Sequence, residues 1–163
     1  MGAAQKKPKQ AFFDDEYDDE EVLIVEDVMA NETYSDTPKS EPIPEVNDGN
    51  VKVIVGDNWN EIVNDTTRDV FVLYYSPVSD AKKVHQLIGL WKLLGKYVSP
   101  ADDIVIAMMD CSKNTVKGLC FDVYPTLILY TKENKQGILY PAALQLFSLN
   151  NFLHDYSQSF RDF

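Results

Sequence analysis

Apolar residues are unevenly spaced along this chain, and their spacing predicts where it folds. From Val51 onward, short apolar runs alternate with polar segments, and one longer stretch has apolar residues at every third or fourth position. Short runs that end at Gly, Pro or Asp are typical of buried strands, whereas the longer recurrence is typical of an amphipathic helix. The predicted strands cover residues 51–55, 70–75, 104–109, 126–130 and 138–140, and the predicted helices cover residues 57–65, 81–98, 115–119 and 148–157.

Two serines stand at the starts of predicted helices and are expected to be their N-caps. Ser79 precedes the long helix and Ser148 begins the last one. A serine hydroxyl accepts a hydrogen bond from the free backbone N–H groups of a first helical turn. Aromatic residues at strand and helix spacing are expected to fill the core, because they bury a large area. They are Trp59, Phe71, Tyr74, Trp91, Phe121, Phe147 and Phe152.

The order of the predicted elements indicates the fold class. It is strand, helix, strand, helix, strand, short helix, strand, strand, helix. Right-handed crossovers between parallel strands place helices on both faces of a sheet. For residues 49–163 we therefore expect an α/β fold with a mixed central sheet of about five strands flanked by helices.

The first 48 residues have a different composition and are predicted to form an acidic, largely extended tail and linker. Residues 1–50 contain 14 Asp/Glu and 4 Lys, a net charge of −10, whereas residues 51–163 contain 12 Asp/Glu and 11 Lys/Arg. A segment so polar cannot bury a core. Neither part has the basic patch that nucleic acids and anionic membranes require, so the sequence predicts no nucleic-acid binding and no direct membrane insertion.

Six large apolar residues interrupt the acidic tail: Phe12, Phe13, Val22, Leu23, Ile24 and Val25. One interpretation is a sticky segment that the flanking charges keep soluble. The other is a docking segment that becomes ordered on a partner. A run of four β-prone residues can add a strand to an exposed sheet edge, and acids on both sides attract a basic surface. We predict that residues 12–29 dock on a protein partner with a basic surface.

Cys111 and Cys120 are the only cysteines, too few for a disulfide framework and without the spacing of a zinc site. Both lie around the predicted short helix and are close enough in sequence to meet in space. They are either buried as small hydrophobes or form a regulatory redox pair. No glycine-rich phosphate loop and no set of metal ligands occurs, so no cofactor and no metal are predicted.

Compartment is predicted from the chain ends and the cysteines. The start lacks the apolar core of a secretory signal, the end is not a retrieval sequence, and no apolar run is long enough to span a membrane. Two cysteines without a framework fit a reducing compartment. We expect a cytoplasmic or cytoskeletal location, with an organelle complex, such as a mitochondrial one, or the endoplasmic reticulum lumen as alternatives.

Motifs of the predicted domain occur in an order known from one protein family. They are VKVIVG at residues 51–56, DVFV at 69–72, YSP at 75–77, KK at 82–83, DIVIAMMD at 103–110 and YPTL at 124–127. In order and spacing they resemble the C-terminal thioredoxin domain of protein disulfide isomerases. Residues 40–45 resemble the linker before that domain in glycoprotein-directed members. The resemblance covers about residues 40–157 and implies a thioredoxin-like fold.

The chain departs from that family where the family's chemistry resides. The family places Cys-x-x-Cys after the second strand, at a helix N-terminus whose dipole stabilises a thiolate. The corresponding segment here is Val78, Ser79, Asp80, Ala81 and Lys82, and no cysteine occurs between Pro77 and Asp110. The two cysteines of the family motif correspond to Ser79 and Lys82 of this sequence or, with one deletion in the alignment, to Ser79 and Ala81. Thiol–disulfide exchange requires a sulfur nucleophile, so this site is predicted to be inactive and the protein not to be an enzyme.

Two supporting residues of the family are also replaced. The buried glutamate behind the active site corresponds to Leu73, and an arginine before the Pro-containing loop corresponds to Asp122. Because a buried carboxylate costs several kcal/mol, an apolar residue is the more stable choice where no proton relay is needed. Tyr124 and Pro125 are retained. In the family this peptide bond is cis and lies beside an extended substrate, so the pair is expected to be cis and is either a peptide groove or a fold-defining turn.

These observations lead to three hypotheses about function. The first is a non-catalytic thioredoxin-like protein that acts through protein contacts, as a structural or accessory subunit of a larger assembly. The second is a redox-independent chaperone or peptide-binding module that uses the groove near Pro125. The third is a thiol redox sensor that uses Cys111 and Cys120.

Overall fold

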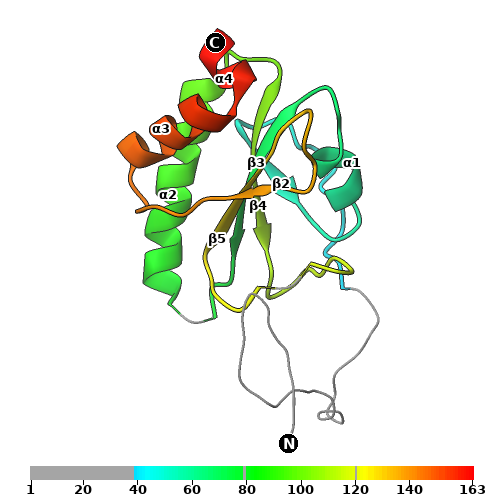
Figure 1. The fold of residues 1–163 in the computed structure, drawn as a ribbon. Coiled ribbons are helices and arrows are strands. Elements are labelled where there is room, and N and C mark those ends of the chain that lie inside the picture. The colour runs from blue at the N-terminus through cyan, green and yellow to red at the C-terminus, as the bar shows by residue number, and fades with distance from the viewer. Residues whose placement is uncertain (1–38, 79, 120) are drawn as a thin grey trace, which may run out of the picture. The chain divides into compact units, whose positions relative to one another are not determined.

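A computed structural model describes residues 39–78, 80–119 and 121–163, which form one sheet with helices on both faces (Figure 1). Within these residues the sheet has five strands in the order β2-β4-β3-β5-β6. The strands are β2 (Val51–Ile54), β3 (Asp69–Tyr75), β4 (Ile104–Asp110), β5 (Thr126–Tyr130) and β6 (Ile138–Leu139). β4 pairs in parallel with both β2 and β3. β5 pairs antiparallel with both β3 and β6. The predicted α/β fold with a mixed central sheet is confirmed.

Different helices cover the two faces of the sheet (Figure 1). One face carries α2 (Ala81–Val98), α3 (Leu146–Tyr156) and α4 (Gln158–Asp162), and the other carries the short helix α1 (Trp59–Val63). α2 has the bounds that its periodicity predicts. Its buried residues Leu87, Trp91, Leu94 and Val98 recur at helical spacing and belong to one core with Phe71, Leu73 and Leu149. Each such side chain contributes about 1.5–3 kcal/mol by leaving water.

The core under α1 contains a chain of hydrogen-bonded aromatic side chains. Trp59 Nε1 donates to the Tyr74 hydroxyl at 2.8 Å, and the hydroxyls of Tyr74 and Tyr130 lie 2.8 Å apart. Burial raises the pKa of both tyrosines above its ordinary value, so both stay neutral. Because each polar tip has a partner, the Tyr74 and Tyr130 rings are buried, and the Trp59 ring half-buried, without the cost of an unsatisfied donor.

Residues 39–50, called the arm below, pack against the folded unit although the sequence assigned most of them to a linker. Thr115 N donates to Lys39 O at 2.9 Å, and Asp57 N donates to Ser40 Oγ at 2.9 Å. Asn114 binds the arm through Glu41, whose backbone N–H and carboxylate both contact the asparagine amide at 2.8 and 2.9 Å. The arm accordingly belongs to the same compact unit as the sheet and its helices.

The arm also covers the outer edge of β2, an edge strand. The Asn47 amide accepts from Val53 N at 2.9 Å and donates to Val53 O at 3.0 Å, as a neighbouring strand would. The Asn58 amide accepts from Val55 N at 2.7 Å. Exposed edges invite pairing with other chains, and these two amides satisfy backbone groups that would otherwise offer such pairing.

Several local predictions are wrong. Asp80, not Ser79, is the N-cap of α2, because its carboxylate accepts from Lys83 N at 3.1 Å. α3 starts at Leu146, before the predicted cap Ser148, and its N-cap residue Gln145 makes no side-chain cap bond. The predicted last helix is two helices, and Ser157 caps the second by accepting from Phe160 N.

Two further predictions also fail. Residues 115–119 do not form a helix; Val116 and Leu119 form an isolated bridge across a tight turn, which Gly118 permits with a φ of 82°. Phe147 is 73% exposed rather than buried. Ser79, Cys120 and the predicted docking residues Phe12, Phe13, Val22, Leu23, Ile24 and Val25 lie outside the described residues. Of the helices that are described, none combines the length and apolarity needed to cross a membrane.

Candidate functional site

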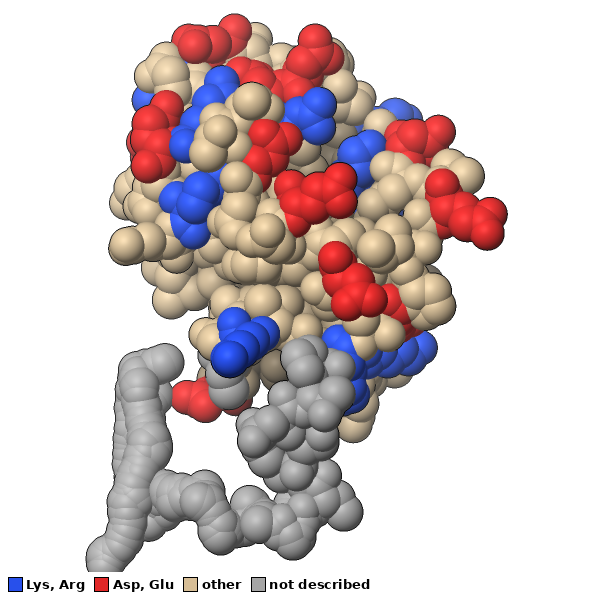
Figure 2. All heavy atoms as spheres, turned by 90° about the vertical axis from the view of Figure 1, so that its right-hand side faces the viewer, with Lys and Arg blue, Asp and Glu red and all other residues tan. Residues whose placement is uncertain are grey.

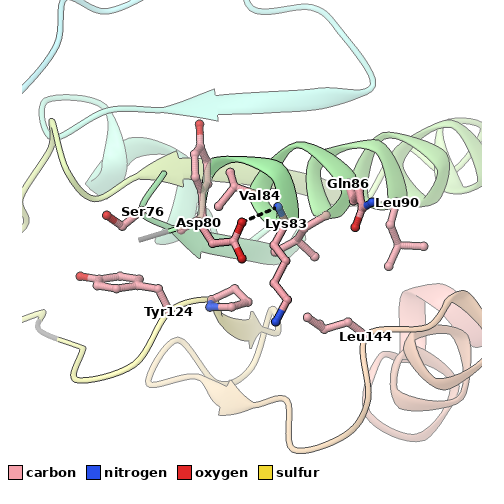
Figure 3. A pocket seen from close by; sticks show the side chains of 11 residues that line it. Ser76, Asp80, Lys83, Val84, Gln86, Leu90, Tyr124 and Leu144 are labelled. Carbon is pink, nitrogen blue, oxygen red and sulfur yellow. Dashed lines mark hydrogen bonds between the residues drawn. The ribbon is translucent and has the colours of Figure 1, made fainter. Parts of the chain in front are cut away.

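A groove of about 530 Å³ opens at the carboxyl end of β3, between α2 and the loop that contains Tyr124 and Pro125 (Figure 3). One wall is the first half of α2, and the opposite wall is the Tyr124–Pro125 loop together with Leu144, which precedes α3. Tyr75 and Ser76, at the end of β3, line it as well. The groove thus brings Asp80 of the degenerate active-site segment together with the retained Tyr-Pro pair, and Asp80 and Tyr124 are 44 residues apart in sequence.

The inner surface of the groove is mainly apolar. Val84, Leu87 and Leu90 supply one side of α2, and Pro125 and Leu144 face them. Polar side chains also line the groove: Lys83 extends from α2 toward Leu144, and Gln86 lies one turn further on (Figure 3). An open, mainly apolar groove with a few polar groups is suited to binding side chains of another molecule.

The N-terminus of α2 is occupied by a carboxylate instead of a thiolate. Asp80 caps the helix through its bond to Lys83 N (Figure 3). Asp80 lines the groove, whereas Val78, Ala81 and Lys82 are exposed and do not line it. The sequence contains no cysteine before Cys111, so no sulfur nucleophile is available at this helix terminus.

Leu73 lies at the centre of the core beneath this site. It is fully buried on β3, between Met108 of β4 and Leu127 of β5 in the sheet register. No carboxylate is therefore supplied to the groove from this position. The side chain packs instead of carrying protons, as the resemblance implies for a site without thiol chemistry.

The Tyr124–Pro125 peptide bond is cis, as predicted. Thr126 Oγ1 donates to Val123 O at 2.6 Å, and the Phe121 ring meets the Tyr124 ring edge-on at 6.1 Å. These contacts hold the loop so that Tyr124 and Pro125 both line the groove (Figure 3). Val123, the preceding residue, is exposed. The arrangement fits both interpretations left open by the sequence, a peptide groove and a fold-defining turn.

Cys111 follows β4 and is half-buried beside Tyr75, to whose carbonyl its backbone N–H donates at 2.7 Å. Burial raises the pKa of its thiol to about 11. Burial likewise raises the pKa of Tyr75 to about 12, with Asp110 contributing. A thiol with a raised pKa is a poor nucleophile at neutral pH, the opposite of what a redox sensor requires. The predicted pair with Cys120 involves a residue outside the described ones.

Sequence reasoning named part of each groove wall but missed other lining residues. Leu144, Leu90 and Gln86 were not singled out, although Leu90 follows Leu87 at the three-residue spacing of one helix face. Leu144 could not be assigned because a loop residue has no periodicity. Across residues 39–78, 80–119 and 121–163, no three His, Cys, Asp or Glu side chains are grouped so that they could hold a metal ion.

Comparisons with known proteins place the chain in a family. The chain is 34% identical over 128 residues to protein disulfide isomerase-like 1-4 of Arabidopsis thaliana, a match that covers 78% of this chain and 21% of that protein. It is 34% identical over 134 residues to protein disulfide-isomerase of Saccharomyces cerevisiae, covering 81% of this chain and 25% of that protein. With protein disulfide-isomerase A3 of Gallus gallus it shares 46% identity over 101 residues, covering 61% and 19%. The chain thus spans about a fifth to a quarter of the length of the curated relatives it matches. No protein-family model matches it.

Solved structures agree on the fold. The first thioredoxin domain of mouse protein disulfide-isomerase A4 superimposes with a TM-score of 0.57 at 20% identity, covering 72% of this chain and 81% of that one. Thioredoxin f from spinach chloroplast superimposes with a TM-score of 0.50 at 14% identity, covering 64% and 84%. Together with the sequence matches, these structures identify the described part of the chain as a thioredoxin-like domain of the protein disulfide isomerase family, in a sequence that has no Cys-x-x-Cys motif.

Proposed function

We propose that this protein is a non-catalytic thioredoxin-like binding module that holds an extended segment of a protein partner in the groove between α2 and the Tyr124–Pro125 loop. One observation carries the proposal. The groove keeps an apolar interior and the Tyr124–Pro125 wall, while the helix terminus beside it is capped by Asp80 and the sequence has no cysteine there. Binding without thiol chemistry is what these residues can perform.

The rest of the fold favours the groove over the β2 edge as the site of contact. Asn47 and Asn58 already satisfy the outward-facing backbone groups of Val53 and Val55. A partner strand would have to displace both amides. At the groove, Leu144 is 40% exposed, so its apolar surface is free to contact a partner. Burying such surface stabilises a complex by about 25 cal/mol per Å².

The wider predictions remain part of this proposal. The protein acts as a structural or accessory subunit of a larger assembly, in which the acidic tail contacts a basic surface of the partner. The location stays a prediction: cytoplasmic or cytoskeletal, with an organelle complex or the endoplasmic reticulum lumen as alternatives. The redox-sensor hypothesis receives no support from Cys111, because burial raises the pKa of its thiol.

The test uses the full chain and a permanently unfolded probe, reduced and carboxymethylated α-lactalbumin, with binding followed by fluorescence anisotropy. Leu144→Glu places a charge in the groove wall and should weaken binding at least fivefold. Leu139→Glu is the matched control, because Leu139 is 62% exposed on β6 and does not line the groove. Equal binding by the two variants would contradict the proposal.

A second assay addresses catalysis directly. In insulin reduction with dithiothreitol, the protein should show no turnover above the uncatalysed rate, because the groove has no sulfur nucleophile. Turnover comparable to that of an active disulfide isomerase would overturn the non-catalytic assignment.

A further inference from the structure

The outward face of α2 has a charge pattern unlike the rest of the domain. The helix contains four lysines and no Asp or Glu, although residues 51–163 together contain 12 acidic and 11 basic side chains. On the α1 side of the molecule, by contrast, acidic and basic side chains are interspersed (Figure 2). Four of the 11 positive charges are therefore concentrated on one helix.

Helical spacing places three of these lysines on one exposed line. Lys82, Lys92 and Lys96 are exposed and lie opposite the buried residues of α2, with His85 and Gly89 between them. Lys82 and Lys96 are 14 residues apart, which corresponds to about 21 Å along the helix. No carboxylate of the described residues forms a salt bridge with any of the three. Their charges are thus unneutralised by the part of the chain that the structure describes.

An exposed apolar ridge runs beside this line. Leu93 is 57% exposed and Tyr97 is 54% exposed, and both continue the four-residue row that begins at His85 and Gly89. The Tyr97 ring also meets the rings of Phe160 and Phe163, with centroid distances of 6.4 and 5.8 Å. Large apolar side chains exposed next to one another mark an interaction surface more often than isolated ones do.

Gly89 precedes Leu93 and Tyr97 on the same line of the helix surface, and the fold does not require a glycine there. A Cβ added at Gly89 would meet no atom within 4 Å. Gly95, in the same helix, differs: a Cβ there would lie 2.7 Å from Asn50 O and Val51 Cγ2. Glycine is among the least favourable residues inside a helix, so its presence needs a reason. At Gly95 the reason is the close packing against residues 50 and 51, whereas packing within the described residues gives no reason at Gly89. A small residue at an exposed helix position allows another backbone to approach closely.

We infer that the α2 face formed by Lys82, Gly89, Lys92, Leu93, Lys96 and Tyr97 is a docking surface for an acidic amphipathic helix of a partner protein. Acidic side chains of such a helix pair with the lysines, its apolar side chains cover Leu93 and Tyr97, and the helices cross at Gly89. A nucleic acid would use the lysines but leave the apolar ridge uncovered. This surface is separate from the groove, whose α2 wall is Val84, Leu87 and Leu90, and it goes beyond the proposed function.

The probe is a fluorescein-labelled 21-residue synthetic helix with Glu on one face and Leu on the other, titrated with the full chain in about 50 mM salt, where charge pairing is weakly screened. Lys92→Gln with Lys96→Gln should weaken binding at least tenfold. The matched control is Lys113→Gln with Lys117→Gln, two exposed lysines outside α2, and it should change the affinity less than twofold. Leu93→Ser should also weaken binding, because it removes apolar contact without changing charge.

Two results would overturn the inference. One is an equal loss of affinity in the α2 pair and in the control pair, which would indicate unspecific charge attraction. The other is binding of a 20-nucleotide single-stranded DNA as tightly as the acidic helix, which would make the surface a general anion site. Because Leu144→Glu leaves this face intact, it should not alter binding of the acidic helix, so failure here and failure of the groove proposal can be told apart.

Discussion

Replacing Asn114 by alanine tests how the arm is held on the domain. The Asn114 side chain is buried and uses both ends of its amide. Its Oδ1 accepts from Glu41 N at 2.8 Å and from Gly56 N at 3.1 Å, and its Nδ2 donates to Glu41 Oε1 at 2.9 Å and to Asp110 O at 3.0 Å. One side chain thereby joins the arm, the end of β2 and the end of β4.

The expected magnitude follows from these four bonds. Alanine removes the acceptor of two backbone N–H groups, and a buried donor without a partner costs about 1–3 kcal/mol. Each lost bond from Nδ2 costs about 0.5–1.5 kcal/mol. Glu41 and Gly56 are only half-buried, so water entering the vacated space recovers part of the loss. We expect the free energy of unfolding to fall by about 3 kcal/mol.

Urea denaturation of Asn114→Ala, followed by tryptophan fluorescence, measures this change. Asn134→Ala is the matched control: Asn134 is exposed and its Oδ1 accepts only from Gln136 N, at 3.0 Å. The control should lose less than about 1 kcal/mol. Hydrogen exchange of the Glu41 and Gly56 amides should accelerate in Asn114→Ala. A loss below about 1 kcal/mol in Asn114→Ala, or unchanged exchange at both amides, would refute the reasoning.

Three other predictions concern single residues. Gly137→Ala should lower the free energy of unfolding by about 2 kcal/mol or more, measured by urea denaturation, because its φ is 99° and an added Cβ would lie 2.6 Å from Ile128 Cγ2. In a Cys120→Ser variant, iodoacetamide should alkylate Cys111 slowly at pH 7.5 and faster toward pH 11, because the pKa of the thiol in the folded protein is about 11. The unfolded chain loses this proton at lower pH than the folded protein, so the free energy of unfolding should fall as pH rises from about 9 to 11. Rapid alkylation at pH 7.5 would contradict the burial argument. Leu73→Glu should lower the free energy of unfolding by about 3–5 kcal/mol at pH 7 and by less at pH 5. Burial raises the pKa of the new carboxyl, and the apolar core tolerates only its neutral form. If Leu73→Gln lowers the free energy of unfolding equally at pH 7, charge plays no part.

The elements predicted best from sequence are those whose pattern is long and uninterrupted. β3 has six buried residues in succession, a pattern that fits a central strand covered on both faces and does not fit an edge strand with one polar face. α2 repeats its apolar positions over 18 residues, and its predicted bounds agree with the structure. The apolar residues that bury these two elements lie within the elements themselves, so their spacing in the sequence is sufficient to predict both.

Helix caps were predicted poorly, and the contacts of the arm were not predicted, because both depend on geometry that the pattern does not contain. Both Ser79 and Asp80 have side chains able to cap, and only the backbone path decides that Asp80 reaches Lys83 N. The arm is held by residues far away in the chain: Glu41 and Asn114 are 73 residues apart. Composition classified the arm as a linker, since its polar side chains bury no core, yet hydrogen bonds to distant backbone groups hold it in place.

The candidate site was predicted in part for the same reason. Asp80, Tyr124 and Pro125 followed from the resemblance, which fixes where a helix terminus and a cis loop meet. The groove between them depends on Leu144, a loop residue whose position is set by the start of α3. A surface feature built from four separate segments has no signature in any one of them.

Leu73 and Asp80, which lie where the family has its chemistry, each stabilise the fold. Leu73 adds a fully buried side chain to the main core, where a carboxylate would have cost several kcal/mol of desolvation. Asp80 caps α2, a contribution of about 1 kcal/mol, where a reactive thiolate would need the same helix terminus for its own stabilisation. A helix terminus can serve the backbone or a nucleophile, and here it serves the backbone. The fold thus gains stability from both residues, and the proposed binding role requires neither a thiolate nor a buried carboxylate.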